Sequence, residues 1–163
     1  EALVKEIQEL LKNPRDLVKA VESLVQERND LRKELEQLQL EKSAGIKEQL
    51  KGQFVQKDTM QVLIAAVTLP NADFLKKLVY ELKNEVSNAC IVLAATIEDK
   101  PQVAVFIDES LLEATGLHAG NLVRELAKEI QGGGGGQPFF ATAGGKDLAG
   151  LPQVVAKAKS ILL

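Results

Sequence analysis

The sequence has 163 residues, a net charge of −3 and 45% hydrophobic residues, which is enough for one ordinary domain with an appendage. One cysteine and one histidine exclude an internal disulfide and a metal site built from Cys and His ligands. The aromatic content of 4% argues against aromatic platforms for single-stranded nucleic acid. No apolar run reaches the roughly 18 residues of a membrane-spanning helix and no signal peptide is evident, so we expect a cytoplasmic chain without a membrane partner.

The first third of the chain, residues 1–52, predicts a helical arm. Residues 2–12 have the apolar spacing of a short helix. A second helix is expected from Pro14 to about Gln39, with Asn13 as its N-cap. One face of this helix carries apolar residues at alternating spacings of 4 and 3, with a single charged residue among them, and this is a heptad seam: Leu17, Val21, Leu24, Arg28, Leu31, Leu35 and Leu38.

The length of the second helix bears on what covers this seam. About 26 residues span about 39 Å, whereas a globule of about 110 residues has a radius of gyration of about 13 Å. The seam therefore packs along a part of the protein outside this chain, is covered within the chain, or pairs with a second copy. We favour a homodimer over packing within the chain. Because the chain begins with Glu1, we also expect it to be a fragment of a longer protein.

Residues 53–163 predict a compact α/β (α+β) domain, separated from the arm near residues 45–55, where Gly45 and Gly52 interrupt the helical pattern. Buried strands are expected at Thr59–Leu69, Cys90–Thr96 and Gln102–Ile107, with a short one at 139–143. The segments between them have the apolar spacing of helices, which is typical of a mixed sheet covered by helices. The short turn at 98–101 predicts that the strands on either side of it are antiparallel.

Five consecutive glycines, Gly132–Gly136, stand between a predicted helix and the strand at 139–143. A flexible linker is one interpretation. The run leads, however, into an apolar strand and a second pair, Gly144–Gly145, before the last helix. We predict a concave loop of bare backbone N–H groups, which suits a phosphate group. The loop lies in residues 118–163, which carry five Lys or Arg against three Asp or Glu.

No catalytic motif is complete. The P-loop pattern fails because Asp147 follows Gly145–Lys146, and the dinucleotide pattern lacks its last glycine. No serine stands in a G-x-S-x-G setting. His118 is expected beside a helix N-terminus and Cys90 in the core. We therefore expect no catalytic residue, no metal site and no cofactor in this chain.

The segment GGGGGQPFFATAGG, together with CIVLAATIEDKPQVAVFIDESLL and HAGNLVRELAKEI, resembles the C-terminal (DHHA1-type, C-Ala) domain of bacterial alanyl-tRNA synthetases. The likeness covers about residues 59–163. The family pattern is a Gly-Gly-Gly run, a basic residue, proline and Ala-x-Ala-Gly-Gly. Many members carry a lysine before the triple glycine and an arginine before the proline, where this chain has Gly133 and Gln137.

The resemblance implies an accessory domain that binds the elbow of alanine-specific tRNA and dimerises through its helical part. It would thereby couple the aminoacylation and editing sites of an ATP-dependent alanine–tRNA ligase, whose ATP, Mg and Zn sites belong to upstream domains. The expected tRNA contacts are the glycine segment and the cations near it: Gly132, Gly133, Gly134, Gly135, Gly136, Gln137, Pro138, Ala143, Gly144, Gly145, Lys146, Arg124 and Lys128.

Two alternatives to the tRNA-binding interpretation stay open on the sequence. The first is the substrate-binding half of a DHH-family phosphoesterase or exonuclease, a family that usually carries histidine where Gln137 stands. The second is a coiled-coil oligomeriser whose glycine loop has no ligand.

Overall fold

The computed structural model describes residues 1–163 and divides into two compact units, Glu1–Ala44 and Gly45–Leu163. Helix α1 (Ala2–Leu10) is followed by α2 (Leu17–Lys51), a single helix of 35 residues. The expected interruption at Gly45 is wrong, because one glycine inside a helix costs only about 1 kcal/mol. The expected N-cap is also wrong: Asn13 has a φ of 53°, and the side chain of Asp16 accepts from the Lys19 amide at 3.1 Å.

The unit formed by residues 1–44 has no core of its own. Ser43 is its one buried residue. The heptad seam remains open to solvent, with Leu24, Leu31 and Leu35 between 52% and 57% exposed. Helix α1 does not cover this seam, and Leu3 and Leu10 on α1 are themselves exposed.

The unit formed by residues 45–163 is built on a six-stranded mixed sheet in the order β1-β2-β3-β4-β6-β5. Strands β2 and β3 are parallel and all other neighbours are antiparallel, which confirms the mixed sheet and the hairpin predicted at 98–101. The sequence did not predict β1, because its three residues are all exposed and show no apolar pattern. The strands are β1 (Val55–Lys57), β2 (Met60–Leu69), β3 (Ala89–Ile97), β4 (Lys100–Ile107), β5 (Gly133–Gly136) and β6 (Phe140–Gly144).

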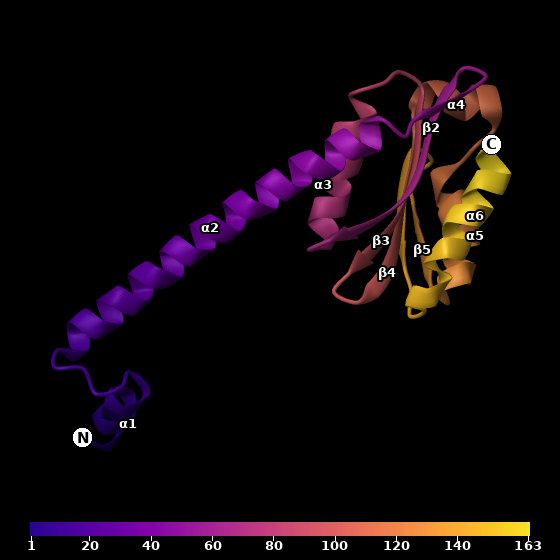
Figure 1. Ribbon diagram of the computed structural model, residues 1–163. Coiled ribbons are helices and arrows are strands. Elements are labelled where there is room, and N and C mark those ends of the chain that lie inside the picture. The colour runs from indigo at the N-terminus through magenta and orange to yellow at the C-terminus, as the bar shows by residue number, and fades with distance from the viewer. The chain divides into compact units, whose positions relative to one another are not determined.

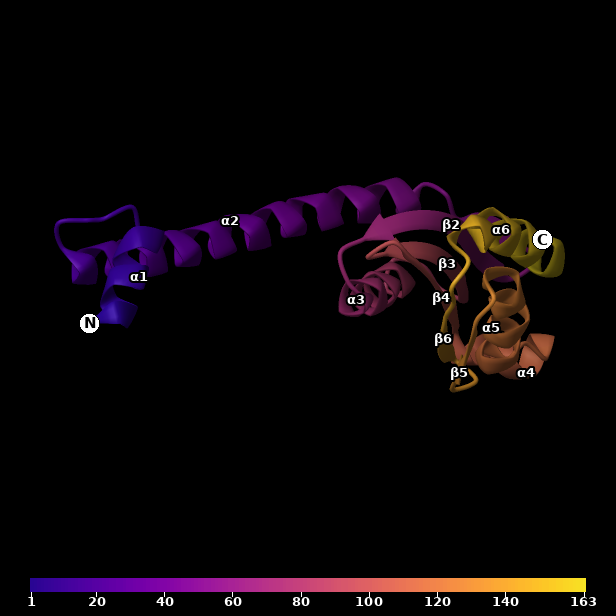
Figure 2. The same ribbon diagram turned by 90° about the horizontal axis from the view of Figure 1, so that it is seen from below.

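Helices cover both faces of this sheet (Figures 1 and 2). One face packs against α3 and the other against α4, α5 and α6. Both sides of β3 are therefore buried, which explains its continuous apolar sequence. No helix has the length and apolar character needed to cross a membrane. The helices of this unit after α2 are α3 (Ala72–Lys83), α4 (Glu109–Thr115), α5 (Ala119–Ala127) and α6 (Leu151–Leu162), with two 3₁₀ turns, η1 (Lys128–Ile130) and η2 (Leu148–Gly150).

Single polar side chains begin three of these helices. Asn71 caps α3, Asp108 caps α4 and His118 caps α5, each by accepting a backbone N–H within the first turn. His118 thus has the structural role that the sequence favoured, since its Nδ1 accepts from the Asn121 amide at 3.3 Å. Cys90 is fully buried in β3, and burial raises the pKa of its thiol to about 12.

Candidate nucleic-acid interface

The glycine run is a β-strand, and the predicted loop is wrong. Residues Gly133–Gly136 form β5, the edge strand of the sheet, and pair antiparallel with β6. The register sets Gly133 opposite Gly144 and Gly136 opposite Ala141. All of these glycines are exposed except Gly135, which is half-buried, so the segment remains accessible.

Every second glycine of this segment is required by the close approach of β5 to β6. A Cβ at Gly134 would overlap the Thr142 carbonyl oxygen and lie 2.5 Å from Ala143 Cα. Added Cβ atoms at Gly132 and Gly136 would meet the β6 segment in the same way. Gly133 has nothing within 4 Å of such an atom. The run therefore serves two purposes: Gly132, Gly134 and Gly136 allow β5 to pack closely against the β6 segment, and Gly133 leaves open space beside the strand.

Most of the backbone N–H groups expected to be bare are hydrogen-bonded within the chain. The amide of Gly132 donates to Ala127 O at 3.0 Å, and that of Gly145 donates to Pro101 O at 3.1 Å. The amide of Lys146 donates to Ile130 O at 2.9 Å. The prediction of a concave array of free N–H groups is therefore wrong for these positions.

The free donors of the segment lie on the outer edge of β5. Gln137, one step beyond β5, donates its amide to Phe140 O at 2.8 Å. Hydrogen bonds alternate along an antiparallel pair, so the bonds to β6 fall on the odd-numbered residues. This alternation turns the N–H groups of Gly134 and Gly136 away from β6, and neither donates a hydrogen bond elsewhere in the chain.

The two predicted cations before the glycine run, one on α5 and one at the start of η1, differ in their surroundings. Arg124 is exposed, forms no ion pair and lies against the glycine strand: a Cβ at Gly135 would be 3.3 Å from its Nη2. Lys128, in contrast, donates to Glu125 Oε1 at 2.6 Å. This hydrogen bond is the main cause that holds the pKa of Glu125 below its usual range. Of these two cations, Arg124 is therefore the one whose charge is not paired within the chain.

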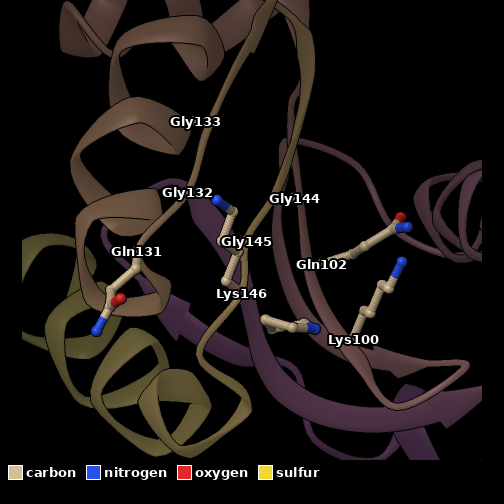
Figure 3. Close-up of a pocket in the computed structure, with 9 residues that line it drawn as sticks. Lys100, Gln102, Gln131, Gly132, Gly133, Gly144, Gly145 and Lys146 are labelled. Carbon is tan, nitrogen blue, oxygen red and sulfur yellow. The ribbon is translucent and has the colours of Figure 1, made fainter.

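A hollow of about 360 Å³ opens beside the glycine segment, on the side of β4. Lys146, predicted as a contact, lines it together with two residues that the sequence analysis missed, Lys100 and Gln102 (Figure 3). Figure 3 shows the ends of Lys100 and Gln102 pointing the same way, with the Lys146 side chain directed toward Gly132 and Gln131 turned aside. Only the sheet register, which pairs Gln102 with Gly144, reveals this neighbourhood.

The remaining predicted contacts are divided between surface and core. Gln137 is exposed and Pro138 is half-buried. Ala143 is only 4% exposed and packs in the core with α5 and α6, so its side chain is not at the surface. No group of three or more His, Cys, Asp or Glu side chains gathers as a metal ion would require.

Comparison with known proteins agrees with this architecture. The DHHA1 domain model matches residues 59–163. An alanine–tRNA ligase of Cytophaga hutchinsonii is 46% identical over 162 residues, which are 99% of this chain and 18% of that protein. Another, from Christiangramia forsetii, is 38% identical over 160 residues, again 18% of its length. The chain thus spans about a fifth of the length of these curated relatives.

A solved structure has the same fold. The C-Ala domain of Aquifex aeolicus alanyl-tRNA synthetase superimposes with a TM-score of 0.59 and 22% sequence identity. The match covers 67% of this chain and 96% of that domain. The chain belongs to the DHHA1 domain family, in the form found in alanine–tRNA ligases.

Proposed function

We propose that this chain is the C-terminal accessory domain of an alanine–tRNA ligase, that it binds the elbow of alanine-specific tRNA, and that it associates with a second copy through its helical arm. In this role it couples the aminoacylation and editing sites of the parent enzyme. Those sites, with their ATP, Mg and Zn, belong to upstream domains, and the enzyme works in the cytoplasm.

The observation that carries the RNA-binding part is the uncompensated charge of Arg124 beside an exposed glycine edge strand. A phosphate group needs a cation and N–H donors, and a backbone without side chains lets an RNA ridge approach closely. Arg124 supplies the cation, and the outward N–H groups of Gly134 and Gly136 supply the donors. The relatives at 46% and 38% identity are alanine–tRNA ligases, which supports tRNA as the RNA.

Filter binding of the chain to alanine-specific tRNA at several salt concentrations tests this part. Each phosphate contact contributes about −0.9 to the slope of log affinity against log salt. Arg124→Ala should weaken binding and lower the steepness of this slope by about 0.9. Lys159→Ala is the matched control, because Lys159 is an exposed, unpaired cation on α6. Equal slopes for the two variants would contradict the proposed contact.

Lys128, the first residue of η1 after the helix that carries Arg124, offers a second comparison. Because it is already bonded to Glu125 at 2.6 Å, it has less free charge to offer RNA. We expect Lys128→Ala to reduce the affinity less than Arg124→Ala does. The reverse order would show that the Glu125 pair opens to contact the RNA.

The observation that carries the dimer is the exposed heptad seam on a unit without a core. Leucines more than half exposed repeat along α2 at the spacing of a coiled coil. Glu27 and Arg32 occupy the g and e positions, where charges on paired helices meet. Burying one leucine contributes about 1.5–3 kcal/mol, so pairing several of them offsets the cost of association.

Sedimentation of seam variants tests the dimer. Leu31→Lys with Leu35→Lys introduces two charges into the seam and should yield monomers. Ser23→Lys with Gln26→Lys adds the same charge away from the seam and should leave the dimer intact. A dimeric seam variant would show that α2 does not form the interface.

A further inference from the structure

We propose that the hollow between the start of β4 and the two glycine segments binds a phosphate group of the RNA backbone, with Lys100 and Lys146 as its cations and Gln102 as an amide donor. This proposal rests on the proposed function and adds a second phosphate contact, on the β4 side of the glycine strand. Lys100 and Gln102 lie outside the glycine motif from which tRNA contacts were predicted.

The hollow is assembled from three segments that are distant in sequence. Its walls are Lys100–Gln102 at the start of β4, Gln131–Gly133 at the start of β5, and Gly144–Lys146 at the end of β6. The register places Gln102, Gly144 and Gly133 in one row across three neighbouring strands. The site therefore exists only in the folded domain.

The charge in this hollow is not balanced by the chain. Neither Lys100 nor Lys146 forms an ion pair, and Glu98 and Asp99 in the preceding turn do not reach Lys100. A bound anion would supply the counter-charge that the chain itself does not provide.

The open floor of the hollow is not needed for the chain's own packing. Gly133 and Gly144 have nothing within 4 Å of an added Cβ, and neither has a positive φ. Gly132 and Gly145 differ, since a Cβ at Gly132 would lie 2.6 Å from Gly145 Cα and one at Gly145 would lie 2.7 Å from Ile130 Cγ1. Glycine costs about 0.5–1 kcal/mol relative to alanine in a strand. Its presence at two unconstrained positions keeps the hollow open for a ligand.

The lining selects a phosphate group over a base. Lysine binds phosphate as a point charge, and amide N–H groups donate to its oxygens. No aromatic side chain lines the hollow, so no stacking platform for a base is present. A phosphate of the RNA backbone therefore fits the site, and a free phosphate ion shares the same chemistry.

Binding of the full chain to alanine-specific tRNA, measured against salt, tests the proposal. Lys100→Ala should lower the steepness of the salt slope by about 0.9. Raising the salt concentration from about 50 to about 200 mM should then weaken tRNA binding by the variant about 3.5-fold less than it weakens binding by the wild type. Lys100→Arg keeps the charge and should retain the slope. Lys159→Ala removes the same charge elsewhere and should also behave as the wild type.

A second variant tests the open floor without removing a charge. Gly144→Val places a strand-compatible side chain in the hollow, where nothing lies within 4 Å of its Cβ. We expect it to keep the wild-type circular dichroism and thermal midpoint and to reduce tRNA affinity at least as much as Lys100→Ala does. Wild-type affinity in this folded variant would overturn the proposal.

The outcomes separate this inference from the proposed function. If the wild type binds tRNA and Arg124→Ala weakens it while Lys100→Ala has no effect, the hollow is not a contact and the proposed function stands. If the wild type binds no tRNA at any salt concentration, both are overturned. A titration with inorganic phosphate at constant ionic strength distinguishes a free anion from RNA. If phosphate shifts the NMR signals of Gly133 and Gly144 while Lys100→Ala binds tRNA as the wild type does, the hollow binds a small anion and the proposed RNA contact is wrong.

Discussion

The close packing of Gly132, Gly134 and Gly136 against β6 leads to a specific prediction for Gly134→Ala. The new Cβ would lie 2.5 Å from Ala143 Cα and 2.7 Å from Ala143 Cβ, whereas carbon atoms in contact prefer about 3.5–4.0 Å. Strand β5 would have to retreat from β6 by about 1 Å, which breaks or weakens about two ladder hydrogen bonds at about 0.5–1.5 kcal/mol each. With about 1–3 kcal/mol for overpacking, we expect a loss of about 2–6 kcal/mol.

The neighbouring position supplies the control. Gly133→Ala adds the same atom to the same strand in open space. It should be neutral or should stabilise by about 0.4–1 kcal/mol, because alanine restricts the unfolded chain. The two variants therefore test close approach separately from the intrinsic preferences of glycine.

Tyr80 offers a local readout of this difference. It is the one tyrosine in a chain without tryptophan, and its ring centroid lies 5.5 Å from that of Phe140 in β6. At about 4 °C per kcal/mol, Gly134→Ala should melt about 8–24 °C below the wild type when followed by tyrosine fluorescence. Equal melting temperatures for the Gly134→Ala and Gly133→Ala variants would refute the packing explanation.

Three further predictions concern stability. Burial raises the pKa of the Cys90 thiol from 9.0 to about 12, so between these pH values only the unfolded chain releases the thiol proton. The free energy of unfolding should therefore fall as pH rises from 9.0 to about 12. In urea titrations, the Cys90→Ala variant should lack this fall. Hydrogen bonds, first from Lys47 and then from Lys51, lower the pKa of Glu85 from 4.5, so the stability that it contributes is full above pH 4.5 and is lost as pH falls through the lower folded value. Glu85→Gln should thus be less stable than the wild type at pH 7 in urea titrations, and the two should converge in acid. Gly45→Ala, with open space at the new atom, should stabilise α2 by about 1 kcal/mol in thermal melts followed by circular dichroism; an unchanged melt would contradict this.

The strands and helices of the α/β unit could be predicted because their signals are local. The apolar runs at β2, β3 and β4 and the spaced apolar residues of α3, α5 and α6 each reflect burial of one or both faces. The heptad seam of α2 is equally visible in the sequence. The end of that helix was misjudged, because glycine penalises a helix without necessarily ending it.

The candidate site depended on information that no local pattern carries. A run of glycines has no side chains and hence no periodicity, so the sequence could not distinguish a strand from a loop at 132–136. Pairing with β6 decides that β5 is a strand. Hydrogen bonds to the carbonyl oxygens of Ala127, Pro101 and Ile130 occupy other N–H groups that a loop would have left free. The nearness of Lys100 and Gln102 to Gly144 follows from the β4–β6 register, which joins residues more than forty positions apart. Composition and periodicity thus determined the elements of this protein, while strand pairing between distant segments decided which backbone groups and cations meet at its surface.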